Sequence, residues 1–354
     1  MENIKTKKAR RYFAAANSYH GFVSLFKDIF RSEEFTRIYV LKGGPGTGKS
    51  SFMKAMIEEF IQHNCDIDEI YCSSDPSSLD GIIIYLGDKK IAVLDGTAPH
   101  ERDAVIPGVI DEIINLGEGW ERKFLSAQRE SVLNLAAEKA KAYATAYSYL
   151  KIAGTANDFI VEEYRKHFDE IEAKNEAERI LAEISDSKNK NVSSRLISSF
   201  GKYGYYKIAD ISELCKKTVN LSGDDFSSIL FIDCCLGILK KKGARAINFP
   251  SALDFKYSDG IIAEDNGLGI MISGKEGMCC DDFIKSKTIL SSQTKCACVI
   301  REDALDAAKR WFLIASDFHF RLEEIYSGAM NFSINNEIIQ QKITEIKKYL
   351  EINR

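Results

Sequence analysis

Residues 43–50 read GGPGTGKS and fit the pattern G-x-x-x-x-G-K-[S/T] of a phosphate-binding loop. The apolar run before it, residues 38–41, is typical of a buried strand, and residues 51–61 after it carry apolar side chains at helical spacing. A glycine-rich turn in this position lets backbone N–H groups approach an anion at the positive end of the helix dipole. The sequence therefore predicts an α/β protein with the P-loop NTPase fold, a parallel sheet flanked by helices.

The loop also predicts ligands and roles. Lys49 is expected to reach the β- and γ-phosphates of a nucleoside triphosphate as a catalytic residue, and the Ser50 hydroxyl is expected to bind Mg²⁺. ATP and Mg²⁺ are therefore the expected cofactors. The residues predicted to hold ATP are Gly43, Gly44, Pro45, Gly46, Thr47, Gly48, Lys49, Ser50 and Ser51.

Two further strands are expected in this half. One covers residues 67–72 and is followed by a polar, turn-rich segment at 73–81. The other covers residues 90–95 and ends at Asp95, the pattern of a strand that delivers an Asp toward Mg²⁺. Asp95 is therefore predicted to be both a metal-positioning and a catalytic residue.

The loop after Asp95 is expected to face the terminal phosphate, because ligands bind at the carboxyl ends of parallel strands. Gly96 stands where many hydrolases carry a Glu, so a general base has to come from elsewhere. His100 is predicted for this catalytic role, with Glu101 and Asp103 as further candidates, and Arg102 could stabilise developing charge. Asp111 and Glu112 are assigned instead to a helix over residues 107–116, where acidic side chains suit the dipole.

Helices are expected elsewhere in the first half as well. Residues 12–16 are predicted to be a short strand, followed by a turn at Gly21 and a helix around residues 22–30. Residues 120–184 are rich in Ala, Glu, Lys and Leu and predict long helices, a hairpin broken near Gly154.

The second half of the chain repeats features of the first in the same order. The matched segments are 12–22 with 195–205, 79–83 with 258–262, 91–96 with 269–274, and 142–184 with 307–350. We therefore predict a duplicated fold, each copy followed by a helical hairpin. The expected domains are a P-loop nucleotide-binding domain (1–120), a helical hairpin insertion (121–190), a degenerate second P-loop-like domain (191–300) and a C-terminal helical segment (301–354).

The second copy lacks the residues that bind phosphate. Where the first half has GGPGTGKSS, residues 221–228 read LSGDDFSS, without the lysine and with Asp224 and Asp225 in the loop. Ser273 stands in the place of Asp95. Carboxylates facing a triphosphate would repel it, so the second copy is not expected to bind ATP by this mechanism.

Composition places the chain among ordinary globular proteins long enough for two domains. The 354 residues have a formal net charge of −4, which gives no indication of nucleic-acid binding. No apolar run of about 18 residues or more predicts a membrane-spanning helix, and the basic N-terminus does not read as a signal peptide. A cytoplasmic protein is expected, with its nine cysteines as free thiols. Four thiols at 279–280, 296 and 298 could hold zinc, but their spacing is not the usual C-x₂-C and favours buried free thiols.

The chain resembles a family of bacterial two-repeat P-loop proteins that are usually described as ATPases or ATP-binding proteins of unknown function. The resemblance covers the whole chain and rests on four motifs, at residues 43–50, 72–81, 94–100 (LDGTAPH) and 107–120. It implies the duplicated fold and ATP as ligand, and it names no substrate. The chain departs from the family in its second half, where the family carries a P-loop of its own.

Three functions are compatible with these residues. The main hypothesis is a slow, Mg-dependent ATPase with one active and one degenerate site, whose cycle moves the helical hairpins where a protein partner would bind. The first alternative is a nucleotide or small-molecule kinase, because residues 94–99 are similar to the L-D-G-F-P-R segment of adenylate kinases. The second is an ATP-switched scaffold without turnover. The oligomeric state stays open.

Overall fold

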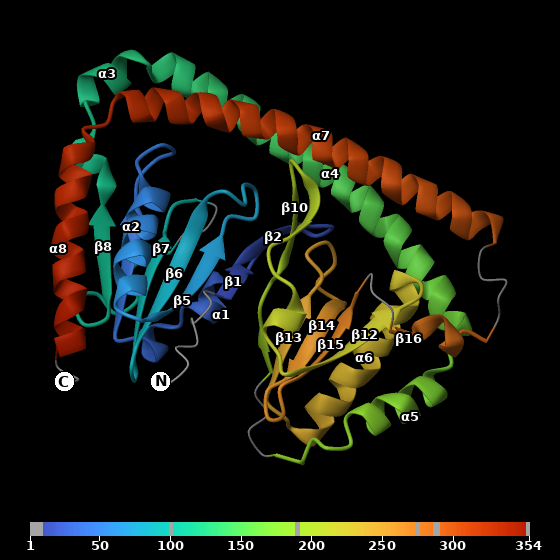
Figure 1. Cartoon of the computed structure of the whole chain (residues 1–354). Coiled ribbons are helices and arrows are strands. Elements are labelled where there is room, and N and C mark those ends of the chain that lie inside the picture. Colours follow the sequence, from blue (N-terminus) through green and yellow to red (C-terminus); the bar gives the residue numbers. More distant parts are fainter. Residues whose placement is uncertain (1–9, 99–101, 188–191, 274–276, 286–290, 352–354) are drawn as a thin grey trace. The chain divides into compact units, whose positions relative to one another are not determined.

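The computed structural model describes residues 10–98, 102–187, 192–273, 277–285 and 291–351 (Figure 1). The chain divides into two compact units, one of residues 1–15, 24–144 and 311–354 and one of residues 16–23 and 145–310. Two long helices, α4 (Arg129–His167) and α7 (Ser292–Gly328), contribute to both units. The units therefore differ from the four sequence segments.

The first unit contains a six-stranded sheet in the order β1-β5-β6-β7-β4-β8. β4 lies between β7 and β8 and runs parallel to both, so the loop that follows it leaves the carboxyl edge of the sheet. The strands are β1 (Arg10–Phe13), β4 (Arg37–Lys42), β5 (Asp66–Tyr71), β6 (Leu79–Leu86), β7 (Lys89–Asp95) and β8 (Asp111–Asn115).

Strand β6 makes this sheet mixed, so the expectation of a parallel sheet is wrong at this strand. β6 runs antiparallel to both β5 and β7. All its side chains except Tyr85 are buried, as in a strand covered on both faces. Gly87, with a φ of +65°, opens the two-residue turn from β6 to β7. The turn-rich segment predicted at 73–81 is therefore too long, since residues 79–81 already belong to β6.

The second unit contains a six-stranded sheet in the order β16-β12-β15-β14-β13-β9. β14 runs antiparallel to both of its neighbours, and the other pairs are parallel. Taken from β9 to β16, the strand order and directions are those of the first sheet from β1 to β8. The strands are β9 (Val192–Ser194), β12 (Lys217–Ser222), β13 (Ala246–Pro250), β14 (Ser258–Ala263), β15 (Leu268–Ile272) and β16 (Met278–Cys279).

Two small two-stranded sheets complete the strands. β2 (Ala15–Ser18) pairs with β3 (Gly21–Ser24), and β10 (Ser198–Gly201) pairs with β11 (Gly204–Lys207). Because residues 21–24 are a strand, the helix expected around residues 22–30 shortens to α1 (Phe26–Ile29). Short 3₁₀ helices in the described ranges are η1 (Ser32–Glu34), η2 (Leu116–Gly119), η3 (Ile211–Glu213) and η4 (Cys280–Phe283).

Helices α2 (Lys49–Gln62) and α8 (Phe332–Glu351) cover one face of the first sheet (Figure 1). Their apolar side chains share one core with β4, β6 and β7. Polar contacts pin α8 there as well, since the Tyr39 hydroxyl donates to Glu345 at 2.9 Å. In the second unit, α5 (Glu170–Ile180) and α6 (Asp225–Lys242) share a core with the second sheet.

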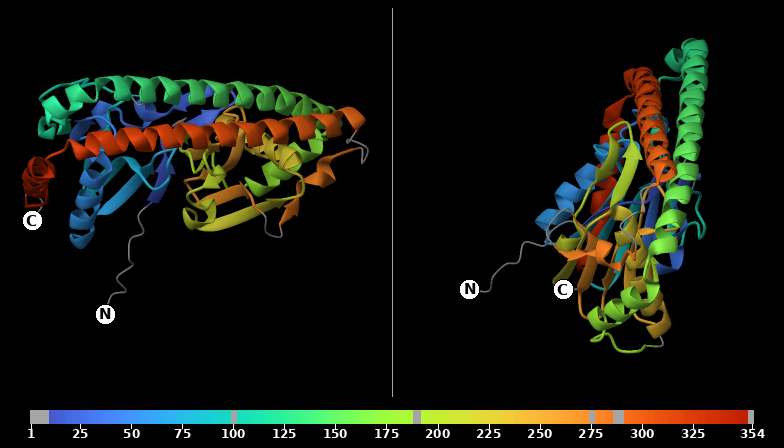
Figure 2. Two further views of the ribbon diagram at one scale, coloured as in Figure 1. Left: turned by 90° about the horizontal axis from the view of Figure 1, so that it is seen from above. Right: turned by 90° about the vertical axis from the view of Figure 1, so that its right-hand side faces the viewer.

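Helices α4 and α7 lie beside each other in both views of Figure 2. In the first unit Tyr143 of α4 meets Phe312 of α7 edge to face, with ring centroids 5.8 Å apart. In the second unit the Arg301 guanidinium of α7 donates to Asn157 of α4 at 3.3 Å. A short helix, α3 (Arg122–Ala127), precedes α4. No helix in the described ranges is long and apolar enough to cross a membrane.

Two helix predictions are wrong. Residues 107–116 were expected to be helical, but residues 111–115 form edge strand β8, because pairing with β4 and a buried ion pair of Asp111 outweigh the local helical pattern. The break expected near Gly154 does not occur, since α4 continues through it. A Cβ at Gly154 would lie 2.6 Å from the Cβ of Tyr19, so this glycine allows close packing rather than a break.

Candidate functional site

The loop of residues 43–50 joins β4 to α2, as the motif requires. Gly46 and Gly48 have φ values of +69° and +85°, a left-handed conformation that favours glycine. A Cβ at Gly43 would lie 2.5 Å from the Thr47 hydroxyl oxygen, so the loop closes only with glycine there. Among the described residues, no side chain caps the N-terminus of α2. Its first N–H groups have no partner within the helix and point to where an anion would bind.

Lys49, the first residue of α2, bridges the loop and the end of β7. Its ammonium donates to the carbonyls of Gly43 at 2.9 Å and Gly44 at 2.8 Å. It also lies 3.6 Å from a carboxylate oxygen of Asp95, and only 13% of the Lys49 side chain is exposed. The structure thus brings together two residues that the sequence predicted to act together.

The Asp95 carboxylate is oriented by the residue that follows Gly96. Thr97 donates to it through both its backbone N–H, at 2.8 Å, and its hydroxyl. Burial raises the pKa of Asp95 above its ordinary value, and the Lys49 ammonium and the Thr97 bonds offset that rise only in part. The Asp95 carboxylate is therefore desolvated, fixed in orientation and beside a lysine at the edge of the sheet.

We expect the Asp95→Asn variant to reveal this raised pKa. The folded chain holds the Asp95 proton more tightly than the unfolded chain, whose Asp has a pKa of about 3.9. The free energy of unfolding of the wild type relative to Asp95→Asn should be largest below that value. It should fall as the pH rises through the folded pKa. Urea unfolding across this range measures the difference, and Asp103→Asn, at a largely exposed side chain, is the control substitution, expected to change the free energy of unfolding little. A difference that rises with pH would contradict this result.

Asp80 is a site residue that the sequence reasoning missed. It is buried, and the register that pairs Gly81 with Leu94 brings it beside Asp95 at the end of β7. Its charge adds to the rise in the pKa of Asp95. The Cys72 thiol is hydrogen-bonded to Asp80, and its own pKa is raised by burial and by that carboxylate. The motif Leu79-Asp80-Gly81 was visible in the sequence, but only the antiparallel course of β6 places it here.

Ser50 and Ser51, the last predicted members of the loop, lie in the first turn of α2. The Ser50 hydroxyl accepts a hydrogen bond from the Leu79 N–H at 3.1 Å, which fixes it near the start of β6. A hydroxyl and a carboxylate are oxygen donors of the kind that Mg²⁺ prefers. The residues present at Ser50 and Asp95 therefore fit a magnesium ion that arrives with a nucleotide.

In the described part of the loop after Asp95, the polar side chains of Arg102 and Asp103 have separate partners. His100, the predicted catalytic residue, and Glu101 lie outside the described residues. Arg102 points into the protein, where it donates to Ser32 at 2.9 Å and forms an ion pair of 3.1 Å with Asp111. Asp103 is exposed and pairs with Lys42 at 2.9 Å. Arg102 therefore has a structural role here rather than a place beside phosphate.

The outer side of the phosphate-binding loop is covered by the end of α7 and the start of α8. A Cβ at Gly46 would lie 2.7 Å from the Glu323 carbonyl, and one at Gly44 would lie 3.4 Å from the Tyr326 ring. The buried Asn335 side chain donates to the Thr47 carbonyl at 2.7 Å. Helices α7 and α8 are therefore in direct contact with the loop. No sequence motif predicts this contact, because it joins residues far apart in the sequence.

Replacing Asn335 with Asp should weaken this contact. The variant removes the donor and sets a carboxylate against the Thr47 carbonyl, so we expect a loss of about 1–3 kcal/mol in the free energy of unfolding. The neighbouring, exposed Asn336 gives the matched control, since Asn336→Asp should change stability little. Urea unfolding of both variants tests this, and equal effects at the two positions would refute it.

The corresponding loop of the second sheet carries its own anions. The Asp224 carboxylate caps α6 by accepting from the Phe226 N–H at 2.9 Å. The Asp281 carboxylate accepts from the Asp224 N–H at 2.9 Å and from the Ser227 hydroxyl at 2.6 Å. Carboxylates of the chain itself therefore accept hydrogen bonds at the N-terminus of α6, in the place where a phosphate would bind.

The cysteines do not form a metal site within the described part of the chain. No group of three or more His, Cys, Asp or Glu residues there could hold a metal ion. Burial raises the pKa of Cys234 to about 11 and that of Cys280 to about 12, so both stay protonated thiols. Buried free thiols were expected, but Cys296 is exposed.

Comparisons of the chain with protein-family models, with curated proteins and with solved structures gave no match.

Proposed function

We propose that the first unit is a P-loop nucleotide-binding domain that binds MgATP through residues 43–51 and hydrolyses it slowly, one nucleotide per chain. The observation that carries this proposal is the loop between β4 and α2, with Gly46 and Gly48 in left-handed conformations and Lys49 held between loop carbonyls and Asp95. The resemblance to two-repeat P-loop proteins supports the same reading. The shared strand order of the two sheets supports a duplicated fold.

The residues of the loop have distinct tasks in this proposal. The N–H groups at the start of α2 bind phosphate oxygens, and the Lys49 ammonium offsets charge on the β- and γ-phosphates. Asp95, oriented by Thr97, and the Ser50 hydroxyl would hold Mg²⁺. When bound, the ion would supply positive charge against the phosphate oxygens. Positioning and electrostatics then supply most of the rate.

One observation favours the kinase alternative. β7, which ends at Asp95, pairs directly with β4, without a strand between them. An intervening strand marks the ATPase branch of P-loop folds, so the direct pairing brings the chain nearer to the kinase-like branch. The contact of Asn335 with the loop suits the third reading, a nucleotide-switched scaffold, because it joins the loop to α8.

ADP release from the purified chain with MgATP, measured together with ATP binding, separates these functions. Turnover without any acceptor supports the ATPase. An ADP burst that depends on an added nucleotide or small-molecule acceptor supports the kinase, and binding without turnover supports the scaffold. If ATP does not bind in the presence or absence of Mg²⁺, the proposal is wrong.

A further inference from the structure

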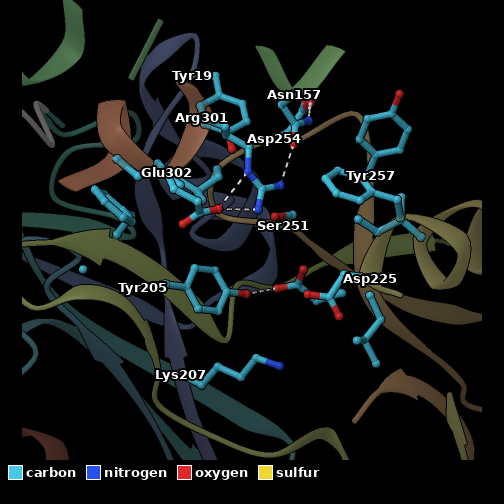
Figure 3. Close-up of a pocket in the computed structure, with 18 of the residues that line it drawn as sticks. Tyr19, Asn157, Tyr205, Lys207, Asp225, Ser251, Asp254, Tyr257, Arg301 and Glu302 are labelled. Carbon is cyan, nitrogen blue, oxygen red and sulfur yellow. Dashed lines mark hydrogen bonds and ion pairs between the residues drawn. The ribbon is translucent and has the colours of Figure 1, made fainter. Parts of the chain in front are cut away.

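The second unit contains a cavity of about 750 Å³ that no predicted function uses (Figure 3). Ser222 and Gly223 line it from the end of β12, and Ser273 lines it from just beyond β15. The β10–β11 hairpin, the first turn of α6 and the α7 residues up to Lys309 supply further walls. By strand order this edge of the second sheet corresponds to the phosphate-binding edge of the first. The volume is within the usual range for small-molecule sites.

The ligand of this cavity should carry no phosphate. At the N-terminus of α6, beside the cavity, the carboxylates of Asp224 and Asp281 already accept hydrogen bonds from backbone N–H groups. A Cβ at Gly223 would lie 2.9 Å from the Asp281 carboxylate, so that group fills the space next to the loop. A phosphate placed there would meet two negative charges.

Two of the carboxylates that line the cavity, Asp259 and Asp225, can accept hydrogen bonds from a ligand. Asp259 is only 7% exposed, and it is held by the Ser198 hydroxyl at 2.9 Å and the Tyr205 hydroxyl at 2.6 Å. Asp225 lines the cavity from the start of α6 (Figure 3). A carboxylate offers about four acceptor positions, so Asp259 keeps capacity for further donors.

Aromatic rings form much of the remaining wall, and they include Tyr205, Phe226 and Tyr257. The Arg301 guanidinium lies 5.0 Å from the centre of the Phe226 ring and is bound to Glu302 at 2.7 Å. The positive charge of Arg301 is therefore already balanced by the Glu302 carboxylate. Flat rings of this kind suit a planar ligand.

The charged side chains that line the cavity have a small negative excess. Three cations (Lys207, Arg301 and Lys309) face five carboxylates (Asp225, Asp254, Asp259, Glu302 and Asp306), which leaves two negative charges in excess. Arg301 is paired with Glu302 at 2.7 Å. Such a lining favours ligand groups that donate hydrogen bonds and disfavours an anion.

We propose that this cavity binds a neutral, planar ligand of nucleoside size, whose hydroxyl or amino groups donate to Asp225 and Asp259. Its ring lies against the aromatic side chains of the wall. This binding activity belongs to the second unit and is independent of nucleotide binding by the first.

Unphosphorylated adenosine, guanosine, cytidine and uridine are the probes, titrated into the full chain by ligand-observed NMR and calorimetry in excess MgADP. We expect at least one to bind, and Asp225→Asn to weaken that binding about tenfold or more. Tyr205→Phe, which removes one of the two hydroxyls that hold Asp259 in place, should also weaken it. Asp233→Asn, at an exposed position of α6 outside the cavity, is the matched control and should leave it unchanged.

Four results would overturn the proposal. Three are no binding of any nucleoside up to about 1 mM, tighter binding of the nucleoside monophosphates, and a preference for spermidine. The fourth is competition by MgADP, because the nucleoside would then occupy the first unit. Asp225 and Tyr205 are both exposed at the cavity, and thermal unfolding of each variant confirms that it is folded.

Discussion

Lys49→Ala is expected to lower the rate of ATP turnover about 100- to 1,000-fold, the usual effect of removing one preorganised electrostatic group from a reacting phosphate or oxyanion site. The ammonium of Lys49 lies between the Gly43 and Gly44 carbonyls and 3.6 Å from Asp95, and in the described residues no other cation has this combination of contacts. The loss should appear mainly in kcat, with weaker nucleotide binding as a smaller effect.

Lys54→Ala is the matched control for this experiment. Lys54 is also on α2, is exposed, and donates only to the Ser77 carbonyl at 3.3 Å. We expect its variant to turn over ATP at the wild-type rate. ADP release is measured for both variants beside their thermal unfolding. Equal rates in the wild type and Lys49→Ala, with both folded, would rule out the proposed site.

Arg102→Met is expected to have the largest effect on stability, about 3–5 kcal/mol near neutral pH. Arg102 and Asp111 are 9% and 0% exposed, so the variant leaves a buried carboxylate without its counter-charge. Asp111 keeps the N–H of Ile106 at 2.7 Å and the Ser32 hydroxyl at 3.0 Å, which are too few to compensate. Arg31→Met, at an exposed pair 4.0 Å long, should cost less than about 1 kcal/mol.

The pH dependence gives the same prediction a second test. Burial alone would raise the pKa of Asp111, but hydrogen bonds from Ile106, Arg102 and Ser32 outweigh it and lower that pKa. The stability from Asp111 is therefore present above its unfolded pKa, about 3.9, and is lost as the pH falls through the lower folded pKa. In Arg102→Met this loss should begin at a higher pH. Urea unfolding at several acid pH values measures it, and identical profiles would contradict it.

The parts of the fold that could be predicted are those with local signals. The strand before the loop, helix α2 and the strand ending at Asp95 were placed within a few residues, because a glycine motif and periodic apolar residues mark them. β6 was missed because its first residues, 79–81, were assigned to the turn-rich segment before it. Its two-residue turn at Gly87 was the available cue.

The site residues that lie in a short sequence motif were predicted. The residues that reach the site only through strand pairing or helix packing were missed. Lys49 and Asp95 are adjacent as predicted, since both follow from the motif and the strand beside it. Asp80 joins them only because β6 is antiparallel, and Asn335 only because α8 packs beside the loop. Arg102 was considered for a charge-stabilising role, but it forms an ion pair with Asp111, which is buried in edge strand β8.

The hydrogen bond from Asn335 to Thr47 spans 288 residues of sequence. On the ribosome, the glycine loop emerges long before the segment that packs against it, and N-terminal regions begin to fold as they emerge. The nascent chain therefore carries this loop without the α7–α8 cover until α8 has been translated. Completion of the packing around the loop thus waits for a segment made 288 residues later.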